Sequence, residues 1–366
     1  MKIIIDKDLQ ELSEILNRDE TLKVSCLAPK DINNKNIKSA EALFLRSITK
    51  IDNKLLENTK VKFVASLTSG EDHINHETLK NLDISLSSGQ GGNTLAVVEY
   101  VLSTLSILLI DKKITPFETK IGIIGFGRIG KKLKEILDAI GFPNIIYDPY
   151  IPECSGTLMD VLECDVITLH CSYSKQGKFP SHHLLTDQHL NKLSKKKFLI
   201  NCSRGEVLTE DYFELKNNNF IFDVWPKENE PNFENYSKPM IATPHIAGKT
   251  IGAENNFSFN ALKDFNNFFD LNLIYSSTHR IKEVFVGKSL EEEINFFGLP
   301  ASLILKVYDV REDDLIFKKY FDNENINEDF QDLRISLKRL GITNHKITGD
   351  VSNKSKSLMN LMGFRL

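Results

Sequence analysis

Three residues in the middle of the chain, Arg204, Glu228 and His245, carry side chains suited to acid–base chemistry on a small organic anion. A guanidinium stays charged and presents a planar fork of donors, so Arg204 is suited to binding a carboxylate. Histidine titrates near neutral pH, with an unperturbed pKa of about 6.5, which makes His245 the natural acceptor of a hydroxyl proton. Glu228 could orient the imidazole ring. Each residue alone is more often structural or solvated, and only their combination suggests a site.

A glycine-rich turn upstream of these residues predicts a nucleotide site. It follows the apolar run 121–124 and precedes residues 131–140, whose apolar side chains fall on one helical face. In a dinucleotide-binding turn the first glycine permits the tight turn, the second lets the backbone approach a pyrophosphate, and the third lets helix and strand pack closely. A glycine turn of purely structural use is the alternative. The turn reads Gly125-Phe126-Gly127-Arg128-Ile129-Gly130.

An acidic residue favours NAD as the nucleotide. Asp148 follows Gly130 by 18 residues and ends the next apolar run, 144–148. A carboxylate at this distance typically accepts a hydrogen bond from the ribose 2′-hydroxyl, which favours NAD over NADP. Together with a proton acceptor and a carboxylate anchor, the turn indicates hydride transfer between a nicotinamide and a small 2-hydroxy acid.

The surrounding pattern predicts an α/β fold with a doubly wound Rossmann sheet. Ligands of such a sheet bind beyond the C-terminal ends of the strands, where Cys171, Arg204, Asp223 and His245 fall. Six short apolar runs supply the expected strands, at 121–124, 144–148, 165–169, 197–201, 220–224 and 240–243.

The chain is expected to divide into three domains. Five strand-like runs before residue 93 predict a second, flavodoxin-like α/β unit, to which a Phe-rich helix near 253–270 could return. A long apolar helix, 94–110, joins the units; Glu99 interrupts it, so it is too short to span a membrane. The active site is expected in a cleft between the first two domains. The assignments are 1–93 with 255–284 for the substrate (lid) domain, 94–254 for the NAD-binding domain, and 285–366 for a small C-terminal α/β domain.

Composition narrows the class further. The 366 residues are 41% hydrophobic and 26% charged, as in ordinary soluble proteins, and the net charge is −4 with both signs interspersed, which argues against a nucleic-acid surface. The N-terminus lacks a secretory pattern. An odd number of cysteines without CxxC spacing favours neither disulfides nor a metal site. We therefore expect a cytoplasmic protein without metal, membrane or nucleic-acid partners. The cysteines are Cys26, Cys154, Cys164, Cys171 and Cys202.

Three segments make the sequence similar to the D-2-hydroxyacid dehydrogenases: Ser203-Arg204-Gly205, Asp223-Val224-Trp225 through Glu228, and Thr243-Pro244-His245-Ile246-Ala247-Gly248. The resemblance implies oxidation of a 2-hydroxy acid with NAD, catalysed by Arg204, Glu228 and His245, with His245 as the proton acceptor. It also implies cofactor contacts, beside the glycine turn, at Asp148, Cys171, Cys202, Ser203, Asp223 and Gly248.

Other segments resemble one branch of that family, whose members oxidise 4-phospho-D-erythronate to 2-oxo-3-hydroxy-4-phosphobutanoate in vitamin B6 biosynthesis. The tail discriminates, because the broader family does not share it, and it implies a homodimer formed through residues 285–366. Ser47 and Thr68 match substrate-contacting positions. The similar segments are 46–50, 68–73, 93–100, 307–314 and 361–364.

Two departures from the family pattern leave alternatives open. Lys249 stands where the family typically has a tyrosine that reaches the substrate, and an ammonium could instead bind a phosphate. Glu230, followed by Pro231 as in the usual Glu-Pro, is the alternative to Glu228, which has the family spacing without gaps. The same chemistry on another acid, such as 3-phosphoglycerate, is the first alternative function. An NAD(H)-sensing binding protein is the second.

Overall fold

The computed structural model describes residues 1–193, 196–209, 219–228, 238–275, 280–322 and 330–366. The chain forms two compact units, Met1–Asn93 with Gly252–Arg280 and Thr94–Ile251 with Ile281–Leu366. Each unit is built around a parallel sheet, so the predicted α/β class is confirmed. The C-terminal segment groups with the second unit, and its assignment as a separate domain stays a prediction.

The first unit holds a five-stranded parallel sheet in the order β2-β1-β3-β4-β5. This is the 2-1-3-4-5 order of flavodoxin-like folds. The strands are β1 (Lys2–Asp6), β2 (Lys23–Leu27), β3 (Ala42–Leu45), β4 (Phe63–Ser66) and β5 (Ser85–Ser88). The connecting helices are short: α1 (Gln10–Leu16), α2 (Asn34–Ile37), α3 (Asn53–Leu56) and α4 (His76–Asn81).

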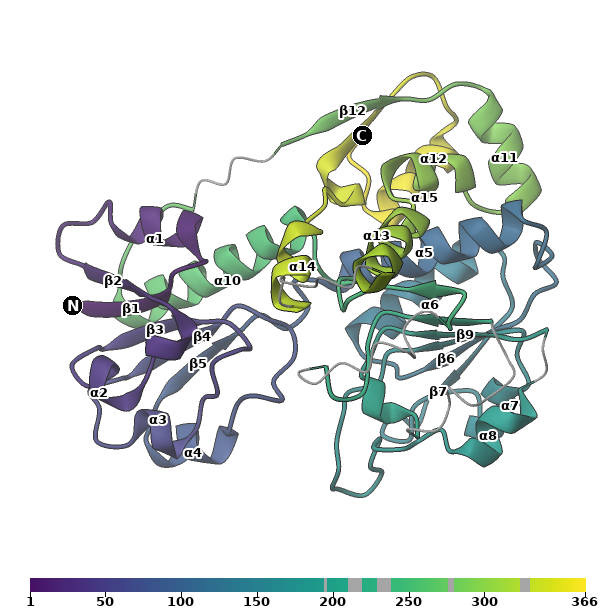
Figure 1. The fold of residues 1–366 in the computed structure, drawn as a ribbon. Helices are drawn as coiled ribbons and strands as arrows, with labels where there is room; N and C mark the ends of the chain where they lie inside the picture. The colour runs from purple at the N-terminus through teal and green to yellow at the C-terminus, as the bar shows by residue number, and fades with distance from the viewer. Residues whose placement is uncertain (194–195, 210–218, 229–237, 276–279, 323–329) are drawn as a thin grey trace. The chain divides into compact units, whose positions relative to one another are not determined.

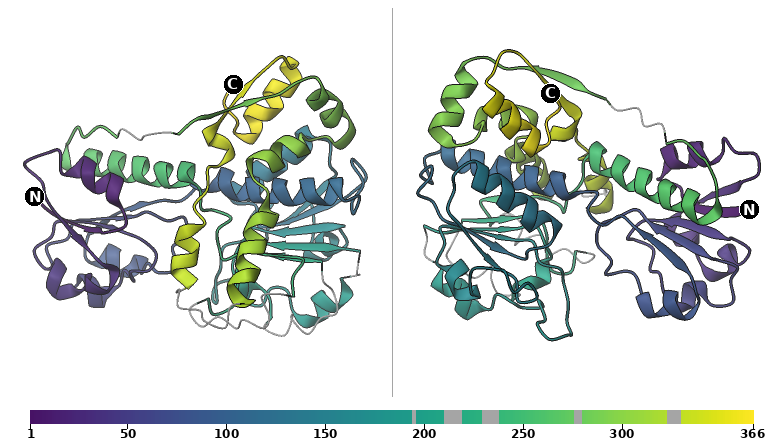
Figure 2. Two further views of the ribbon diagram at one scale, coloured as in Figure 1. Left: turned by 45° about the horizontal axis from the view of Figure 1, so that its top comes forward. Right: turned by 180° about the vertical axis from the view of Figure 1, so that it is seen from behind.

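A later helix, α10 (Ile251–Phe269), returns to this unit and covers one face of its sheet (Figures 1 and 2). Its buried Phe265 packs edge-on against Phe44 and Phe63, with ring centroids 5.2 and 5.7 Å apart. The strands β3 and β4 supply those two rings. The predicted return of a Phe-rich helix is therefore confirmed, and aromatic packing holds it in place.

The second unit is built on a six-stranded parallel sheet in the order β11-β10-β9-β8-β6-β7. All six predicted runs form strands: β6 (Ile121–Ile124), β7 (Asn144–Tyr147), β8 (Val166–Leu169), β9 (Phe198–Asn201), β10 (Phe220–Phe222) and β11 (Ile241–Ala242). The predicted apolar helix is α5 (Thr94–Ile110), nearly all of it buried. Within the described ranges, no helix is long and apolar enough to cross a membrane. The described residues around this sheet also form α6 (Arg128–Ala139), α7 (Leu158–Leu162) and α8 (Asp187–Lys192).

The C-terminal segment packs on this sheet rather than standing apart from it. Helix α12 lies against α5, α13 lies along β11, and α15 contacts α6. Asp314 of α13 accepts the backbone N–H of Ala242 at 2.7 Å, which satisfies a donor on the edge strand β11. The segment comprises β12 (Lys282–Phe285), α11 (Ser289–Phe297), α12 (Ala301–Val307), α13 (Val310–Asp322), α14 (Phe330–Ser336), β13 (His345–Thr348) and α15 (Asn353–Met362).

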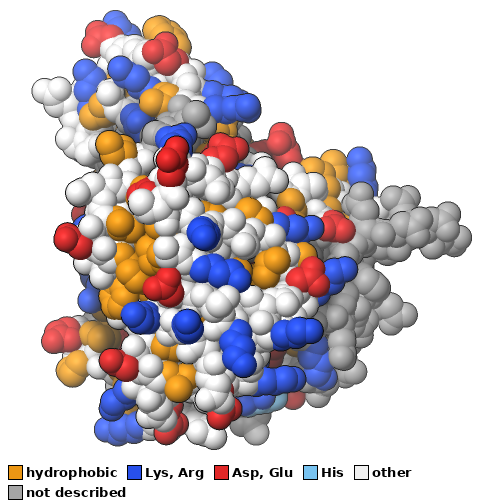
Figure 3. All heavy atoms as spheres, turned by 90° about the vertical axis from the view of Figure 1, so that its left-hand side faces the viewer, with side chains coloured by type: hydrophobic (Ala, Val, Ile, Leu, Met, Phe, Trp, Pro, Cys, Tyr) orange, Lys and Arg blue, Asp and Glu red, His pale blue; other side chains and the backbone are white. Residues whose placement is uncertain are grey.

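The surface carries both signs of charge. On the face in Figure 3, acidic and basic side chains both occur across the surface, with apolar side chains scattered between them. This distribution agrees with the net charge of −4 and the interspersed charges of the sequence.

Phe265→Ala tests whether α10 is an integral part of the first unit. We expect the substitution to lower the free energy of unfolding by about 3–5 kcal/mol, because it removes a fully buried ring and leaves a cavity. The matched control, Phe259→Ala on the same helix, removes a ring that is 51% exposed and should cost less than about 1 kcal/mol. Denaturant-dependent hydrogen exchange of the β3 and β4 amides measures both. Equal losses would contradict the assigned packing.

Candidate functional site

Two glycines of the glycine turn are required by close packing. Gly125 follows β6 with φ of +98°, and a Cβ there would lie 2.5 Å from the backbone nitrogen of Cys171. A Cβ on Gly130 would lie 2.1 Å from the carbonyl oxygen of Gly125. The turn therefore brings the end of β6, the start of α6 and the two residues that follow β8 into backbone contact.

Gly127 has no such packing reason to be glycine. Among the described residues, no heavy atom lies within 4 Å of the position a Cβ would take. Gly127 precedes α6 as its N-cap, and no described side chain caps the helix there. At a helix N-terminus the N–H groups of the first turn point outward along the helix axis, away from the carbonyls of later turns. An open cradle at a helix N-terminus fits a pyrophosphate, which the backbone amides would bind.

Asp148 lies just beyond the end of β7 and beside this turn. Its Oδ2 accepts the N–H of Phe126 at 2.9 Å, and its Oδ1 accepts the N–H of Tyr150 at 3.0 Å. A carboxylate has about four acceptor positions, so both oxygens retain capacity for ribose hydroxyls. Its negative charge opposes a 2′-phosphate, and the residues present therefore fit NAD.

The predicted cofactor positions after β8 and β9 are polar but not nucleophilic. Burial raises the pKa of the Cys171 thiol to about 11 and that of Cys202 well above its ordinary value, so both thiols stay protonated. Ser203 donates from its N–H and its hydroxyl to Oδ1 of Asn201, at 3.0 and 2.9 Å. These contacts fix the backbone that leads into Arg204. No group of three or more potential metal ligands occurs within the described ranges.

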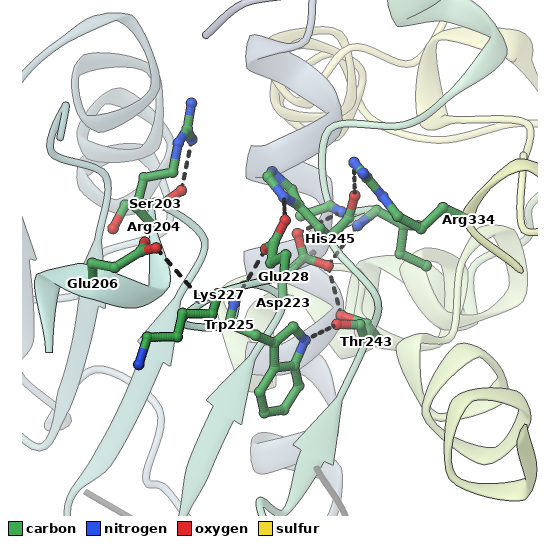
Figure 4. A network of polar contacts seen from close by, with 12 residues as sticks. Ser203, Arg204, Glu206, Asp223, Trp225, Lys227, Glu228, Thr243, His245 and Arg334 are labelled. Carbon is green, nitrogen blue, oxygen red and sulfur yellow. Dashed lines mark hydrogen bonds and ion pairs between the residues drawn. The ribbon is translucent and has the colours of Figure 1, made fainter. Parts of the chain in front are cut away.

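The structure brings Glu228 and His245 together (Figure 4). Oε2 of Glu228 lies 2.7 Å from Nδ1 of His245, and both side chains are partly buried. The other oxygen, Oε1, accepts the N–H of Trp225 at 3.2 Å. Burial acts to raise the pKa of Glu228, but His245 and Arg334 outweigh it and the net pKa is lowered. Glu228 is therefore an ionised acceptor for an Nδ1–H. The alternative, Glu230, lies outside the described residues.

Arg204 stands apart from this pair. It follows β9, and its Nη1 donates to the carbonyl oxygen of Ser203 at 2.8 Å. Figure 4 shows its guanidinium separated from the imidazole of His245. The intervening space is where a substrate bound by both groups would have to lie, so the catalytic role of Arg204 stays a prediction.

A buried aspartate shapes the loop that carries His245. Asp223, at the end of β10, accepts the N–H groups of Ile246 and Ala247 and the hydroxyl of Thr243, at 2.7, 2.9 and 2.7 Å. Burial raises its pKa, and these donors and His245 oppose that rise. The oxygens of Asp223 therefore hold the loop, and its predicted contact with the cofactor stays a prediction.

His245 has a strained backbone. Its φ is +57°, a left-handed conformation that costs a non-glycine residue about 1 kcal/mol or more. Its N–H donates to the carbonyl of Asp223 at 2.6 Å. The indole of Trp225 donates to the carbonyl of Thr243 at 2.8 Å, and this bond joins the Glu228 and His245 segments. The strain persists because the surrounding bonds fix the loop.

The remaining predicted positions lie in both units. Gly248 and Lys249 end the His245 loop and are partly exposed; the N–H of Lys249 donates to the carbonyl of Ile246 at 2.8 Å. Ser47 and Thr68 follow β3 and β4 of the first unit, which are adjacent strands, so both residues are at the same edge of that sheet.

Sequence reasoning missed two arginines that touch the loop. Arg334 donates to the carbonyl of His245 at 3.1 Å, and Arg339 donates to the carbonyl of Ile246 at 2.9 Å. Both come from the C-terminal segment, about ninety residues further along the chain. Their charges resemble those of any exposed helix face, and no local motif marks them.

Comparison with known proteins places this geometry in a family. Residues 112–247 match the model of the D-isomer specific 2-hydroxyacid dehydrogenase, NAD binding domain. The chain is 31% identical to the erythronate-4-phosphate dehydrogenase of Marinomonas sp. (strain MWYL1) over 380 residues, covering 100% of this chain and 99% of that protein. The chain belongs to the erythronate-4-phosphate dehydrogenase family. It is an NAD-dependent oxidoreductase, and its glycine turn lies in the family's NAD-binding domain.

Other relatives agree. The erythronate-4-phosphate dehydrogenase of Bacteroides thetaiotaomicron is 35% identical over 292 residues, which cover 76% of this chain and 83% of that protein. Solved structures share the fold. NAD-bound 3-phosphoglycerate dehydrogenase from Entamoeba histolytica has a TM-score of 0.60 at 24% identity, covering 76% of this chain and 99% of that one. D-lactate dehydrogenase from Aquifex aeolicus, in complex with NAD and lactic acid, has a TM-score of 0.61 at 20% identity, with 74% and 96% covered.

Gly127→Val tests the cradle separately from the fold. The backbone at Gly127, with φ of −74° and ψ of −158°, is open to any residue, and the space beside it is free. We therefore expect an unchanged melting temperature but a dissociation constant for NADH raised at least about tenfold, since the side chain would occupy the pyrophosphate position. Gly130→Ala is the contrasting variant and should lower the melting temperature. Unchanged NADH affinity in Gly127→Val, measured by fluorescence titration, would place the pyrophosphate elsewhere.

Proposed function

We propose that the protein oxidises 4-phospho-D-erythronate at C2 to 2-oxo-3-hydroxy-4-phosphobutanoate in vitamin B6 biosynthesis. The observation that supports this most is the His245–Glu228 pair, which lies beside an NAD-binding turn in a chain that matches an erythronate-4-phosphate dehydrogenase along its whole length. Bound NAD would supply the hydride acceptor. The other steps belong to residues of this chain.

His245 acts as the proton acceptor. The Nδ1–H donates to the ionised Glu228, which fixes the tautomer and leaves Nε2 as the basic nitrogen. Nε2 takes the C2 hydroxyl proton while the C2 hydride leaves, and the C2–O bond becomes a carbonyl. Glu228 then stabilises the imidazolium. Positioned general base catalysis of this kind contributes about 10²- to 10⁴-fold.

Substrate binding divides between charged and hydroxyl groups. Arg204 binds the C1 carboxylate through its planar guanidinium. Ser47 and Thr68 offer hydroxyl donors at the ends of β3 and β4. Lys249, at the end of the His245 loop, supplies a positive charge for the phosphate. This assignment makes the phosphate, rather than carbon-chain length, the main determinant of specificity.

Two other functions remain to be separated by experiment. A relative in fold acts on 3-phosphoglycerate, as its name states, and that acid also carries a carboxylate, a C2 hydroxyl and a phosphate. An NAD(H) sensor would need the glycine turn but not a paired histidine. The ionised Glu228 bonded to His245 therefore favours an enzyme over a sensor.

We also propose a cytoplasmic homodimer formed through the C-terminal segment. Large apolar side chains are exposed on that segment, and α13 presents two in succession, Leu315 and Ile316, which are 53% and 45% exposed. An exposed apolar patch of this kind is typical of a protein interface. Five free cysteines and the use of NAD suit a reducing compartment.

Turnover tests the proposed reaction. The purified protein should reduce NAD with 4-phospho-D-erythronate, and much less with 3-phosphoglycerate or D-lactate, in an NADH absorbance assay. His245→Ala should lower kcat about 10²- to 10⁴-fold, because the proton acceptor is lost, while NADH binding remains. Preferred turnover of 3-phosphoglycerate would keep the chemistry and reject the substrate. No turnover of any acid by folded, NADH-binding protein would favour the sensor.

Oligomeric state tests the interface. Light scattering should give twice the chain mass of 41.7 kDa for the wild type. The double variant Leu315→Glu with Ile316→Glu should give a monomer, since charges in an apolar interface are strongly unfavourable. Ile48→Glu, at an exposed apolar residue of the first unit, is the control and should stay dimeric. A wild-type monomer at micromolar concentration would refute the proposed dimer.

A further inference from the structure

We propose that Arg339 is a positioning residue for the reaction, holding the His245 loop in its strained conformation through the loop's backbone carbonyls. The inference rests on the proposed catalytic role of His245. It concerns a residue of the C-terminal segment, and it gives that segment a part in catalysis as well as in assembly.

The shorter hydrogen bonds of the Arg339 side chain are to one stretch of backbone. Its Nη1 donates to the carbonyls of Ile246 and Lys249, at 2.9 and 3.3 Å, and its Nη2 donates to that of Ala247 at 3.3 Å. These three carbonyls all lie within the four residues that follow His245. A planar fork of donors can hold several carbonyls in a fixed relation, whereas an ammonium concentrates its charge at one point.

The arginine is itself held in place. Its guanidinium lies over the ring of Tyr308, 3.7 Å from the centroid, and the hydroxyl of Tyr308 donates to Asp313 at 2.9 Å. The arginine is partly buried, and its Nε has no partner among the described residues. Its backbone carbonyl accepts the N–H of Ile251 at 3.0 Å. Both ends of the residue are therefore fixed relative to the loop.

A buried carboxylate supplies the counter-charge. Glu99 of α5 is 2% exposed, and its Oε2 accepts the N–H of Ile342, three residues after Arg339, at 3.0 Å. Burial raises the pKa of Glu99 to about 7, and the charge of Arg339 acts against that rise. Although Glu99 and Asp313 lie nearby, three of the side-chain hydrogen bonds of Arg339 are to carbonyls of the loop, and a longer one, at 3.5 Å, is to the carbonyl of Ala96 on α5. A guanidinium that donates hydrogen bonds to loop carbonyls, although carboxylates lie nearby, is positioned to hold the backbone of the loop in one conformation.

The arrangement explains how the loop can hold a left-handed histidine. Asp223 binds the amides of Ile246 and Ala247 from the sheet side. Arg339 binds the carbonyls of Ile246 and Ala247 from the C-terminal segment. Loss of either side would let the peptide planes rotate. A rotation that moved Nε2 by about 1 Å would be enough to cost on the order of 100-fold in rate.

The test removes the guanidinium while keeping an apolar stem. Arg339→Met should lower kcat about 10- to 100-fold, as expected for a misplaced base, with the dissociation constant of NADH unchanged within about twofold because the glycine turn lies elsewhere in the sheet. Arg339→Lys should recover part of the loss by restoring charge and one donor. The resonance of the His245 Nδ1–H, assigned by its absence in His245→Ala, should shift or broaden in Arg339→Met.

A control separates positioning from stability. Met359→Ala removes a fully buried side chain of α15 in the same segment without touching the loop. It should lower the melting temperature at least as much as Arg339→Met does, yet keep kcat and the His245 resonance. Equal loss of kcat in the two variants, or an unchanged His245 resonance in Arg339→Met, would overturn the proposal. An inactive wild type would reject the proposed function, and the resonance would still decide the role of Arg339.

Discussion

Hydrogen bonding of one loop, residues 243–249, is the constraint on which the site depends. His245 adopts a left-handed backbone that a free loop would relax, so the surrounding structure must determine it. One buried carboxylate, Asp223, binds the loop's amides, and two arginines, Arg334 and Arg339, bind its carbonyls. Hydrogen bonds to the amides and to the carbonyls of the loop therefore stabilise its strained backbone. The direction of the imidazole is a consequence of these hydrogen bonds.

The partner of His245 depends on equally remote contacts. The backbone just before Glu228 packs closely against Gly205. A Cβ on Gly205 would lie 2.0 Å from the backbone carbon of Trp225. The buried indole packs against Phe222 of β10 and Phe317 of α13, with ring centroids 6.2 and 5.8 Å apart. The C-terminal segment therefore supports both Glu228 and His245. This support explains why the segment shares a compact unit with the nucleotide-binding sheet.

The sequence predicts best where structure follows from local pattern. Six apolar runs and a glycine turn suffice to predict the sheet and its strands, because a βαβ unit is built from neighbouring residues. The Asp223 to His245 spacing also pointed to Glu228, which the structure pairs with His245. The family resemblance predicts a cofactor contact for Asp223, whereas its hydrogen bonds to the His245 loop are visible only in the structure. Arg334 and Arg339 could not be found, since their partners are backbone carbonyls, which leave no mark in a sequence.

The two halves of the site therefore differ in which parts of the chain determine their geometry. The nucleotide half is local, and the NAD-binding family model spans only residues 112–247. The acid–base half lies in the same residues but is held by contacts from beyond residue 300. The solved structures with this fold cover about three quarters of the chain, whereas the Marinomonas relative covers all of it. The contacts of the C-terminal segment with the His245 loop couple the packing of that segment to the geometry of the histidine. A change in how that segment packs would then shift the His245 loop through its carbonyl oxygens, without any change in the glycine turn.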